Sequence, residues 1–283
     1  EYAICEYLAL HAGRTFSKEQ IYEAVFGYDG TAEEQVRRAG AAAAVFDMKA
    51  DDGSLGYISS LEPAQAGGVS AADPAINGAI RGLNAGELYT VARVSCFRDN
   101  AIPRADMSLG IKSSAGNWRD EGDCRWLSAA NAAARQYVIG VCAELAELGF
   151  DELLLENCAF PARGQVDYIV AGENYDPDGL TDALETFCRE LEEALADYPQ
   201  LKVSFGSSQA VLTGEANDRS GQTAAWLAEH AWRVYVAVPA GDESAYEQTL
   251  RAAGLPAGRL VPVTEAPAGA GENWAVLTRT PTE

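Results

Sequence analysis

The chain has 283 residues, of which 48% are hydrophobic, and this suits one large α/β domain with a sizeable core. Its 42 acidic and 21 basic residues give a formal net charge of −21, which repels phosphate backbones and argues against nucleic acid as a partner. None of the six cysteines lies in a C-x-x-C pair and only two histidines are present, so we expect no metal site and no cofactor. The sequence has no apolar run of membrane-spanning length.

Residues 1–30 differ from the rest of the chain. Apolar residues at helical spacing mark a first helix, and Ser17 with Gln20 forms a capping box for a second. This stretch, EYAICEYLALHAGRTFSKEQIYEAVFGYDG, resembles two helices of the winged-helix output domain of bacterial OmpR-type response regulators. The DNA-reading helix and the wing of that family are missing, because the chain continues as TAEEQVRRAGAAAAVFDMK. We therefore expect a helical hairpin that does not bind DNA.

From Thr31 onward, helical and strand patterns alternate. Such alternation indicates a parallel sheet covered by helices, and it predicts a second domain over residues 31–283. The strands are expected at residues 43–48, 88–97, 153–155, 202–205, 234–238, 260–264 and 274–277. Seven strands are one short of a closed (β/α)8 barrel. We predict an α/β, TIM-barrel-like fold whose first strand is missing or replaced by the N-terminal hairpin; a doubly wound open sheet is the alternative.

Three carboxylates stand where predicted strands end. Glu156 directly follows an unbroken apolar run, Asp47 lies at the end of an earlier strand, and Asp99 follows another. Barrel enzymes place their chemistry at the C-terminal ends of parallel strands. Each carboxylate also has an ordinary structural interpretation. Glu156 could cap the next element or pair with an arginine, Asp47 could form a salt bridge with Lys49 or Arg93, and Asp99 could cap a turn.

Several motifs occur in the order known from one bacterial family. They are VFDMKADDGSLGYIS, VARVSCFRD, NWRD followed by Trp126, ELGFDELLLENCAFP, and SGQ at residues 220–222. Residues 31–240 thereby resemble a family of glycosyl-hydrolase TIM barrels that was formerly a domain of unknown function. The family's first strand lies upstream of the equivalent of Thr31, where this chain has the hairpin. The resemblance implies a glycoside hydrolase that acts on a polysaccharide or a cell-wall glycan.

Cleavage of a glycosidic bond usually needs two carboxyl groups, one to protonate the leaving oxygen and one to attack or to activate water. We expect Glu156 to be the general acid, since the apolar strand behind it would favour the protonated form. Asp47 is its expected partner and Asp99 the reserve. The expected substrate contacts are Lys49, Arg93, Arg98, Trp118, Trp126, Gln222 and Tyr235.

Some of these residues have a second interpretation. Trp118 and Trp126 lie in the long segment 101–130 and could anchor it in the core instead of stacking on sugars. Arg93 lies inside an apolar strand and needs an acidic partner if it is buried. The family's Asp-Tyr-x-Arg-Phe-Pro appears here as Glu156-Asn-Cys-Ala-Phe-Pro, without the tyrosine and the arginine. That loss favours the alternative function, a carbohydrate-binding barrel without turnover.

Two further questions concern the N-terminal part of the chain. Residues 1–30 suggest a transcriptional regulator as a third hypothesis, against which the missing recognition helix and the charge both argue. The compartment is left open, because the sequence starts at Glu1 and not at a methionine. An export or anchor segment upstream would place the protein in the cell envelope or outside the cell.

Overall fold

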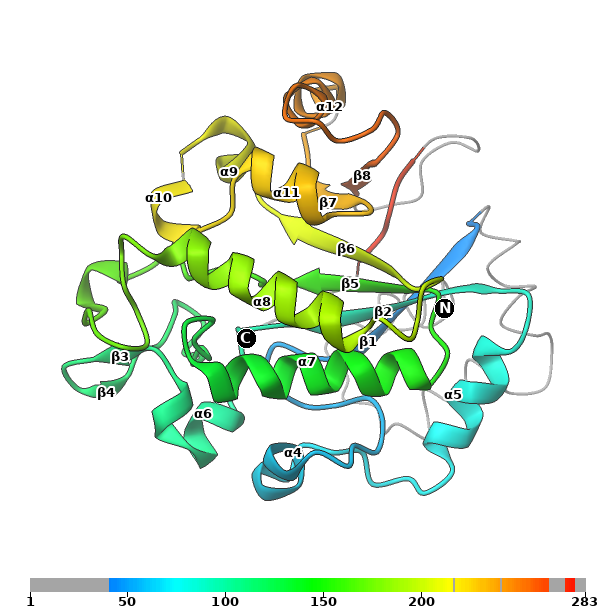
Figure 1. Ribbon diagram of the computed structural model, residues 1–283, viewed down its shortest axis with the longest axis horizontal. Coiled ribbons are helices and arrows are strands. Elements are labelled where there is room, and N and C mark those ends of the chain that lie inside the picture. Colours follow the sequence, from blue (N-terminus) through cyan, green and yellow to red (C-terminus); the bar gives the residue numbers. More distant parts are fainter. Residues whose placement is uncertain (1–40, 216, 240, 265–272, 278–283) are drawn as a thin grey trace.

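A curled, all-parallel sheet forms the centre of the molecule. The computed structural model describes residues 41–215, 217–239, 241–264 and 273–277. Its six strands lie in the order β1-β2-β5-β6-β7-β8 and make a half-barrel (Figure 1). They are β1 (Ala43–Lys49), β2 (Tyr89–Ser95), β5 (Glu152–Glu156), β6 (Lys202–Ser207), β7 (Val234–Ala237) and β8 (Leu260–Val263). Because every pair is parallel, all six C-terminal ends meet at one end of the sheet.

Helices connect the strands and cover one face of the sheet. Helices α7 and α8 pack against each other in front of β2 and β5 (Figure 1). The longer helices are α5 (Ile76–Asn84), α7 (Ala132–Glu147), α8 (Leu180–Ala194), α11 (Ala224–His230) and α12 (Glu243–Ala252). The shorter ones are α4 (Glu62–Gly67), α6 (Ile102–Ala105), α9 (Gln209–Thr213) and α10 (Asn217–Ser220), with 3-10 turns η1 (Met107–Leu109) and η2 (Val166–Tyr168).

Local sequence signals explain the central helix and the strand that follows it. Asn131 caps α7, because its side-chain oxygen accepts hydrogen bonds from the N–H groups of Ala133 and Ala134 at 3.0 and 3.1 Å. After α7 ends, Gly149 adopts φ +90°, a conformation that favours glycine. The chain then enters β5, in which all five residues are buried. A strand covered on both faces is what an unbroken apolar run predicts.

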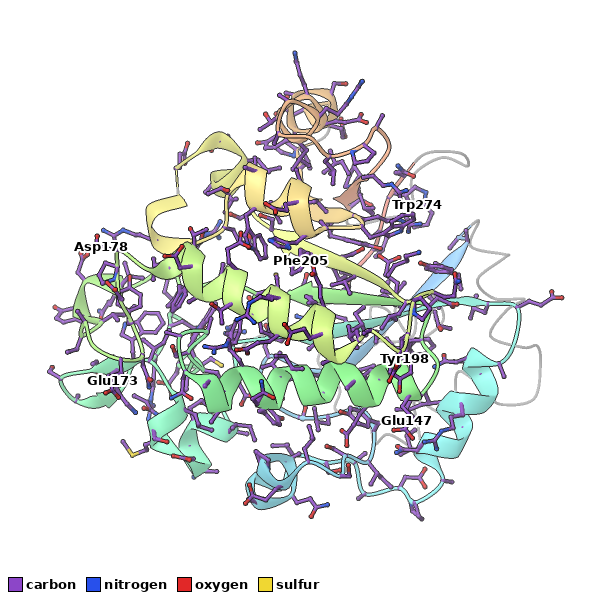
Figure 2. All side chains as sticks on the ribbon, in the orientation of Figure 1. Glu147, Glu173, Asp178, Tyr198, Phe205 and Trp274 are labelled. Carbon is purple, nitrogen blue, oxygen red and sulfur yellow. The ribbon has the colours of Figure 1, made fainter. Side chains whose placement is uncertain are left out.

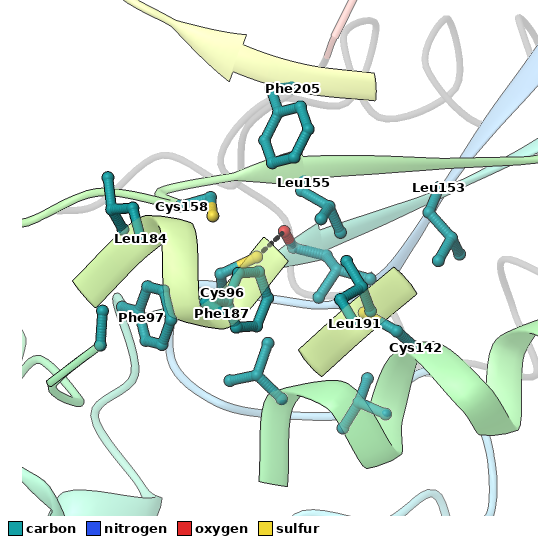
Figure 3. Close-up of a cluster of buried hydrophobic side chains, with 14 of the residues drawn as sticks. Cys96, Phe97, Cys142, Leu153, Leu155, Cys158, Leu184, Phe187, Leu191 and Phe205 are labelled. Atoms are coloured by element: carbon teal, nitrogen blue, oxygen red, sulfur yellow. Dashed lines mark hydrogen bonds between the residues drawn. The ribbon is translucent and has the colours of Figure 1, made fainter. Parts of the chain in front are cut away.

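The main core lies between the sheet and the helices. Figure 3 shows side chains of β5 and α8 meeting there with those of Cys96 and Phe97, which follow β2, and the rings of Phe97 and Phe187 are 5.2 Å apart. Phe205 of β6 extends into the same layer (Figure 2), and its ring lies 4.9 Å from that of Trp226 on α11. Cys142 and Cys188 are buried free thiols in this core, as their places on apolar helix faces predict.

Six of the seven predicted strands are strands of the sheet. The seventh, at residues 274–277, is reduced to one parallel bridge between Ala275 and Val263. The segment 101–130 is more regular than expected, since it contains α6, η1 and a hairpin of β3 (Lys112–Ser113) and β4 (Gly116–Asn117). The predictions for residues 1–30, the helical hairpin and the replaced first strand, lie outside the described residues.

Candidate functional site

Strand alternation brings Asp47, Arg93 and Glu156 to the inner face of the curled sheet. Neighbouring residues Ala92, Leu153 and Leu155 belong to the core on the helix side. Residues of the opposite parity, among them Val91 and Leu154, form a second apolar cluster on the inner face. Asp47, Arg93 and Glu156 continue that inner row toward the C-terminal ends of their strands. The register pairs Asp47 with Arg93 and Ser95 with Glu156, so three different strands contribute to one small area.

The Arg93 guanidinium joins the two carboxylates. Its Nε donates to Glu156 Oε2 at 2.7 Å, and its Nη2 also lies 2.7 Å from that oxygen. Its Nη1 donates to Asp47 Oδ1 at 2.8 Å. The Glu156 side chain is 7% exposed, whereas that of Asp47 is 36% exposed. Both carboxylates therefore share one cation, and Asp47 is the one that solvent or a ligand can reach.

Asp51 extends this group toward the segment 101–130. Its Oδ1 accepts from Arg93 Nη2 at 2.7 Å, and its Oδ2 accepts from Arg98 Nη1 at 2.5 Å. Arg98 Nε in turn donates to Asp120 Oδ2 at 2.6 Å. The charges alternate from Asp47 to Asp120, so each guanidinium lies between carboxylates. Sequence reasoning missed Asp51 and Asp120 because both lie in turns, where no strand or helix period indicates the direction of a side chain.

The pKa directions distinguish Asp47 from Asp51. Burial raises the pKa of the Asp47 carboxyl, and the opposing effect of Arg93 does not fully offset it. Burial also acts to raise the pKa of Asp51, but the guanidinium groups of Arg93 and Arg98 outweigh it and the pKa is lowered. Of these two carboxyls, Asp47 is thus the one that holds a proton more readily, and Asp51 stays ionised.

Known proteins resemble this chain in sequence and in fold. The family model described as "Putative glycosyl hydrolase domain" matches residues 31–248, more than half of the chain. The chain belongs to this family. The protein is also similar in fold to the PgaB (BpsB) glycoside hydrolase domain of Bordetella bronchiseptica, with a TM-score of 0.61 at 15% identity over 88% of this chain and 80% of that one. The TIM-barrel-like α/β fold that the sequence predicts is confirmed.

Two other proteins match this chain, one in structure and the other over a short stretch of sequence. A hypothetical protein from Ruminiclostridium thermocellum is 23% identical with a TM-score of 0.52, covering 67% of this chain and 91% of that one. The transcriptional regulatory protein SpaR of Bacillus subtilis is 66% identical over 32 residues, which are 11% of this chain. The matched part spans only 14% of that regulator, so the likeness concerns one short segment.

Lys49 and Asp99 of this family member form a separate buried pair. Their side chains are both 0% exposed, and Lys49 Nζ lies 2.8 Å from Asp99 Oδ2. The register of β1 and β2 shifts between Asp47 and Lys49, which takes Lys49 out of the alternation, and its ammonium lies 6.0 Å from the ring of Tyr137 on α7. Because both side chains are buried and paired with each other, the geometry does not support the expected roles of Lys49 as a substrate contact and Asp99 as a reserve catalyst, which stay predictions.

Both tryptophans of the segment 101–130 anchor it in the core. Trp118 is 3% exposed and its Nε1 donates to the Gln165 carbonyl at 2.9 Å, and Trp126 is 8% exposed. Trp126 Nε1 donates to Asp120 Oδ2 at 3.0 Å, next to Arg98. Both rings are buried, as the anchoring interpretation expects, and their expected role as substrate contacts stays a prediction. Arg98, another expected substrate contact, is occupied by its two carboxylates.

Gln222 and Tyr235 also have structural partners. Gln222 Nε2 donates to the carbonyls of Cys158 and Gly206 at 2.9 and 3.3 Å, so this buried side chain ties the ends of β5 and β6 together. The Tyr235 hydroxyl donates at 3.1 Å to Glu152, the first residue of β5, and not to Glu156 at its last. Tyr235 thus reaches the first residue of β5, and Gln222 joins the ends of two strands, while their expected roles as substrate contacts stay predictions.

The backbone of β6 at Gly206 passes unusually close to the Glu156 side chain. A Cβ atom on Gly206 would lie 2.8 Å from Glu156 Cγ, so only glycine leaves room for this side chain. The next residue, Asn157, has φ +50°, and its Nδ2 donates to Ser95 Oγ at 2.8 Å and to Asp51 at 3.3 Å. Asparagine tolerates this left-handed conformation better than most residues do. The turn after β5 thus holds Glu156 against Arg93.

Potential metal ligands occur elsewhere. In the described ranges, Glu185, Glu229 and His230 are the group whose ligand atoms lie within 4.8 Å of one another. They come from α8 and α11 on the outer layer, where His230 Nε2 lies 2.8 Å from Glu185 Oε2. A pocket of about 380 Å³ lies beside them, lined by residues of α8, the segment that leads from it into β6, and residues 230–232. Of the helices that the structure describes, none has the length and apolar character needed to cross a membrane.

Proposed function

We propose that this protein is a glycoside hydrolase that cleaves a polysaccharide or a cell-wall glycan at the C-terminal end of its half-barrel. One observation carries the proposal: Asp47 and Glu156, from different strands, meet on either side of Arg93 in a member of a glycosyl hydrolase family. Two carboxyl groups of different protonation are what glycosidic cleavage requires. The inner face of the sheet brings two carboxyl groups to one guanidinium, which supports the proposal.

The roles of the two carboxyls are exchanged relative to the sequence prediction. An apolar environment was the reason to expect Glu156 to be the acid, yet its carboxylate lies against the Arg93 guanidinium. Asp47 is more exposed than Glu156, yet the protein atoms packed around its carboxyl exclude enough water to raise its pKa. We therefore assign proton donation to the leaving oxygen to Asp47. Glu156, which lies against the Arg93 guanidinium, is then the group that attacks the sugar or activates water.

A carbohydrate-binding barrel without turnover is the second candidate. Arg93 engages Asp47, Asp51 and Glu156 at the same time, which leaves both carboxylates already paired. The chain also lacks the tyrosine and arginine that the family motif has after its central strand. In that case the Asp47 side chain, which is 36% exposed, would bind sugar hydroxyls, and no bond would be cleaved.

The deciding experiment measures reducing-sugar release from a panel of plant, storage and cell-wall polysaccharides. Wild type is compared with Asp47→Asn and Glu156→Gln, and Asp123→Asn is the control, since that carboxylate is exposed and paired with Arg119. We expect each site variant to lose roughly a hundredfold or more in rate and the control to retain it. Wild-type activity should fall as pH rises through the pKa of Asp47, because the acid must be protonated.

Other outcomes have definite meanings. Release that survives in both site variants would overturn the proposal. Binding of a glycan without release, abolished by Asp47→Asn, would establish the second candidate. We also propose that nucleic acid is not a partner, on the basis of the charge of −21. Retardation of duplex DNA by the protein in a gel shift at low salt would contradict this.

A further inference from the structure

We infer that Asp51 is a positioning residue of this site: its carboxylate holds Arg93 and Arg98 together and fixes how Arg93 is shared between Asp47 and Glu156. The inference rests on the proposed function for its catalytic meaning. The contacts of Asp51 with Arg93 and Arg98 do not depend on whether the protein cleaves a sugar.

Asp51 is fixed from several directions. It lies in the turn after β1, where Gly53 N–H donates to the Ala50 carbonyl at 3.0 Å. The thiol of Cys124 contacts the Asp51 carbonyl at 3.2 Å, which ties this turn to the segment 101–130. Asn157 adds a hydrogen bond from the turn after β5. The backbone of Asp51 is thus held in its turn and by Cys124, and its carboxylate is held by Asn157, so that it can hold a guanidinium in one orientation.

The contact with Asp51 determines which nitrogen of Arg93 faces which carboxylate. Nη2 is shared between Asp51 Oδ1 and Glu156 Oε2, both at 2.7 Å, and Nη1 is left for Asp47. When Asp51 is ionised, Asp47 receives one hydrogen bond from Arg93. The positive charge of Arg93 is then also shared with Asp51 and Glu156. Without the Asp51 charge, more of the attraction of Arg93 would fall on Asp47 and would favour its ionised form.

The charged groups that face Asp47 give the direction in which its pKa should change when Asp51 is replaced. After burial, which raises its pKa most, Arg93 on β2 lowers the pKa, whereas Asp51 in the turn and Glu156 on β5 raise it. Replacing Asp51 by asparagine removes one raising charge and keeps an oxygen in place. The pKa of Asp47 should therefore fall. Asp47 would then lose its proton, and with it its ability to act as the acid, at a lower pH than in wild type.

The test follows the carboxyl of Asp47 by carbon-detected NMR titration of the full chain, with the signal assigned by its loss in Asp47→Asn. Wild type is compared with Asp51→Asn, Asp51→Glu and Asp120→Asn. Asp120 is the matched control, since it belongs to the same chain of charges but contacts Arg98 and not Arg93. We expect a downward shift in Asp51→Asn, a smaller one or none in Asp51→Glu, and none in Asp120→Asn.

The same variants are assayed for sugar release against pH. In Asp51→Asn the alkaline limb of kcat/KM should move to lower pH together with the NMR titration. An unchanged Asp47 titration in Asp51→Asn, or an equal shift in Asp120→Asn, would overturn the inference. So would an Asp51→Asn protein that fails to fold while Asp120→Asn folds, because Asp51 would then be merely structural. If wild type releases no sugar, the proposed function fails, and the NMR titration still decides the role of Asp51.

Discussion

At the scale of single residues, Arg93 explains why the site can exist. Carboxylates gathered on one face of a sheet repel one another, and an arginine in an apolar strand cannot be buried without a counter-charge. Asp47, Asp51 and Glu156 meet both requirements at once. The fixed planar fork of the guanidinium suits this sharing, which the single ammonium of a lysine could not reproduce.

The buried pair of Lys49 and Asp99 gives a prediction at the same scale. Replacing Lys49 by methionine leaves the Asp99 carboxylate buried with hydrogen bonds from the N–H groups of Ala101 and Ile102 but no cation. Removing one partner of a buried pair costs about 3–5 kcal/mol of unfolding free energy. Urea denaturation measures the loss.

The control for Lys49→Met is Arg189→Gln. This substitution breaks an exposed pair in which Arg189 lies 3.4 Å from Glu193, and such a pair contributes only about 0.3–0.5 kcal/mol. Equal losses in the two variants would show that the Lys49 pair is not buried as described.

Single residues were predictable where a strand fixed their direction. Asp47, Arg93 and Glu156 lie at the strand positions where the apolar pattern placed them, and Arg93 pairs with acids as an arginine in an apolar strand must. Trp118 was ambiguous because a loop tryptophan can face a ligand or the core, and only the tertiary contact with Gln165 decides between these. Asp51 could not be recognised, since its partners lie up to 106 residues away.

At the scale of elements, the spacing between β5 and β6 controls the position of Glu156. Gly206→Ala would place a Cβ 2.8 Å from Glu156 Cγ and 3.4 Å from its Cα, so the carboxylate must move away from Arg93. A misplacement of about 1 Å can cost a hundredfold in rate, while overpacking costs about 1–3 kcal/mol of stability. Sugar release and urea denaturation of the same sample separate the two effects.

The matched variant for Gly206→Ala is Gly82→Ala in α5. A Cβ there meets nothing within 4 Å, and alanine in a helix is favoured over glycine by about 0.5–1 kcal/mol. It should keep full activity and gain stability. Full activity in Gly206→Ala would mean that Glu156 is not held by this contact, or that it has no part in the reaction.

Elements were predictable in proportion to their periodicity. The run Leu153–Leu154–Leu155 and the apolar face of α8 have one interpretation each, and both are present. The segment at 274–277 has the composition of a strand but forms one bridge, because pairing depends on a neighbour and not on propensity alone. The short β3–β4 hairpin lies among polar residues with no alternation to indicate it.

At the scale of the whole molecule, the excess of acid sets how stability responds to salt. The 42 acidic and 21 basic residues give a net charge of −21 at pH 7, so unfolding relieves self-repulsion. Sodium chloride shortens the screening length from about 10 Å at 0.1 M to about 3 Å at 1 M and weakens that repulsion. It also weakens exposed pairs such as Arg119 with Asp123, but each of these contributes little.

Tm at pH 7 should therefore rise with sodium chloride. For a chain of this size, each kcal/mol gained corresponds to roughly 2–4 °C. Repeating the series near the sequence pI of 4.4 is the internal control, because the net charge is then close to zero while any effect of the salt on apolar burial remains. The rise should be clearly smaller at that pH. A Tm that falls with salt at pH 7 would mean that ion pairs outweigh self-repulsion, and that networks like that of Arg93 dominate the electrostatics of the fold.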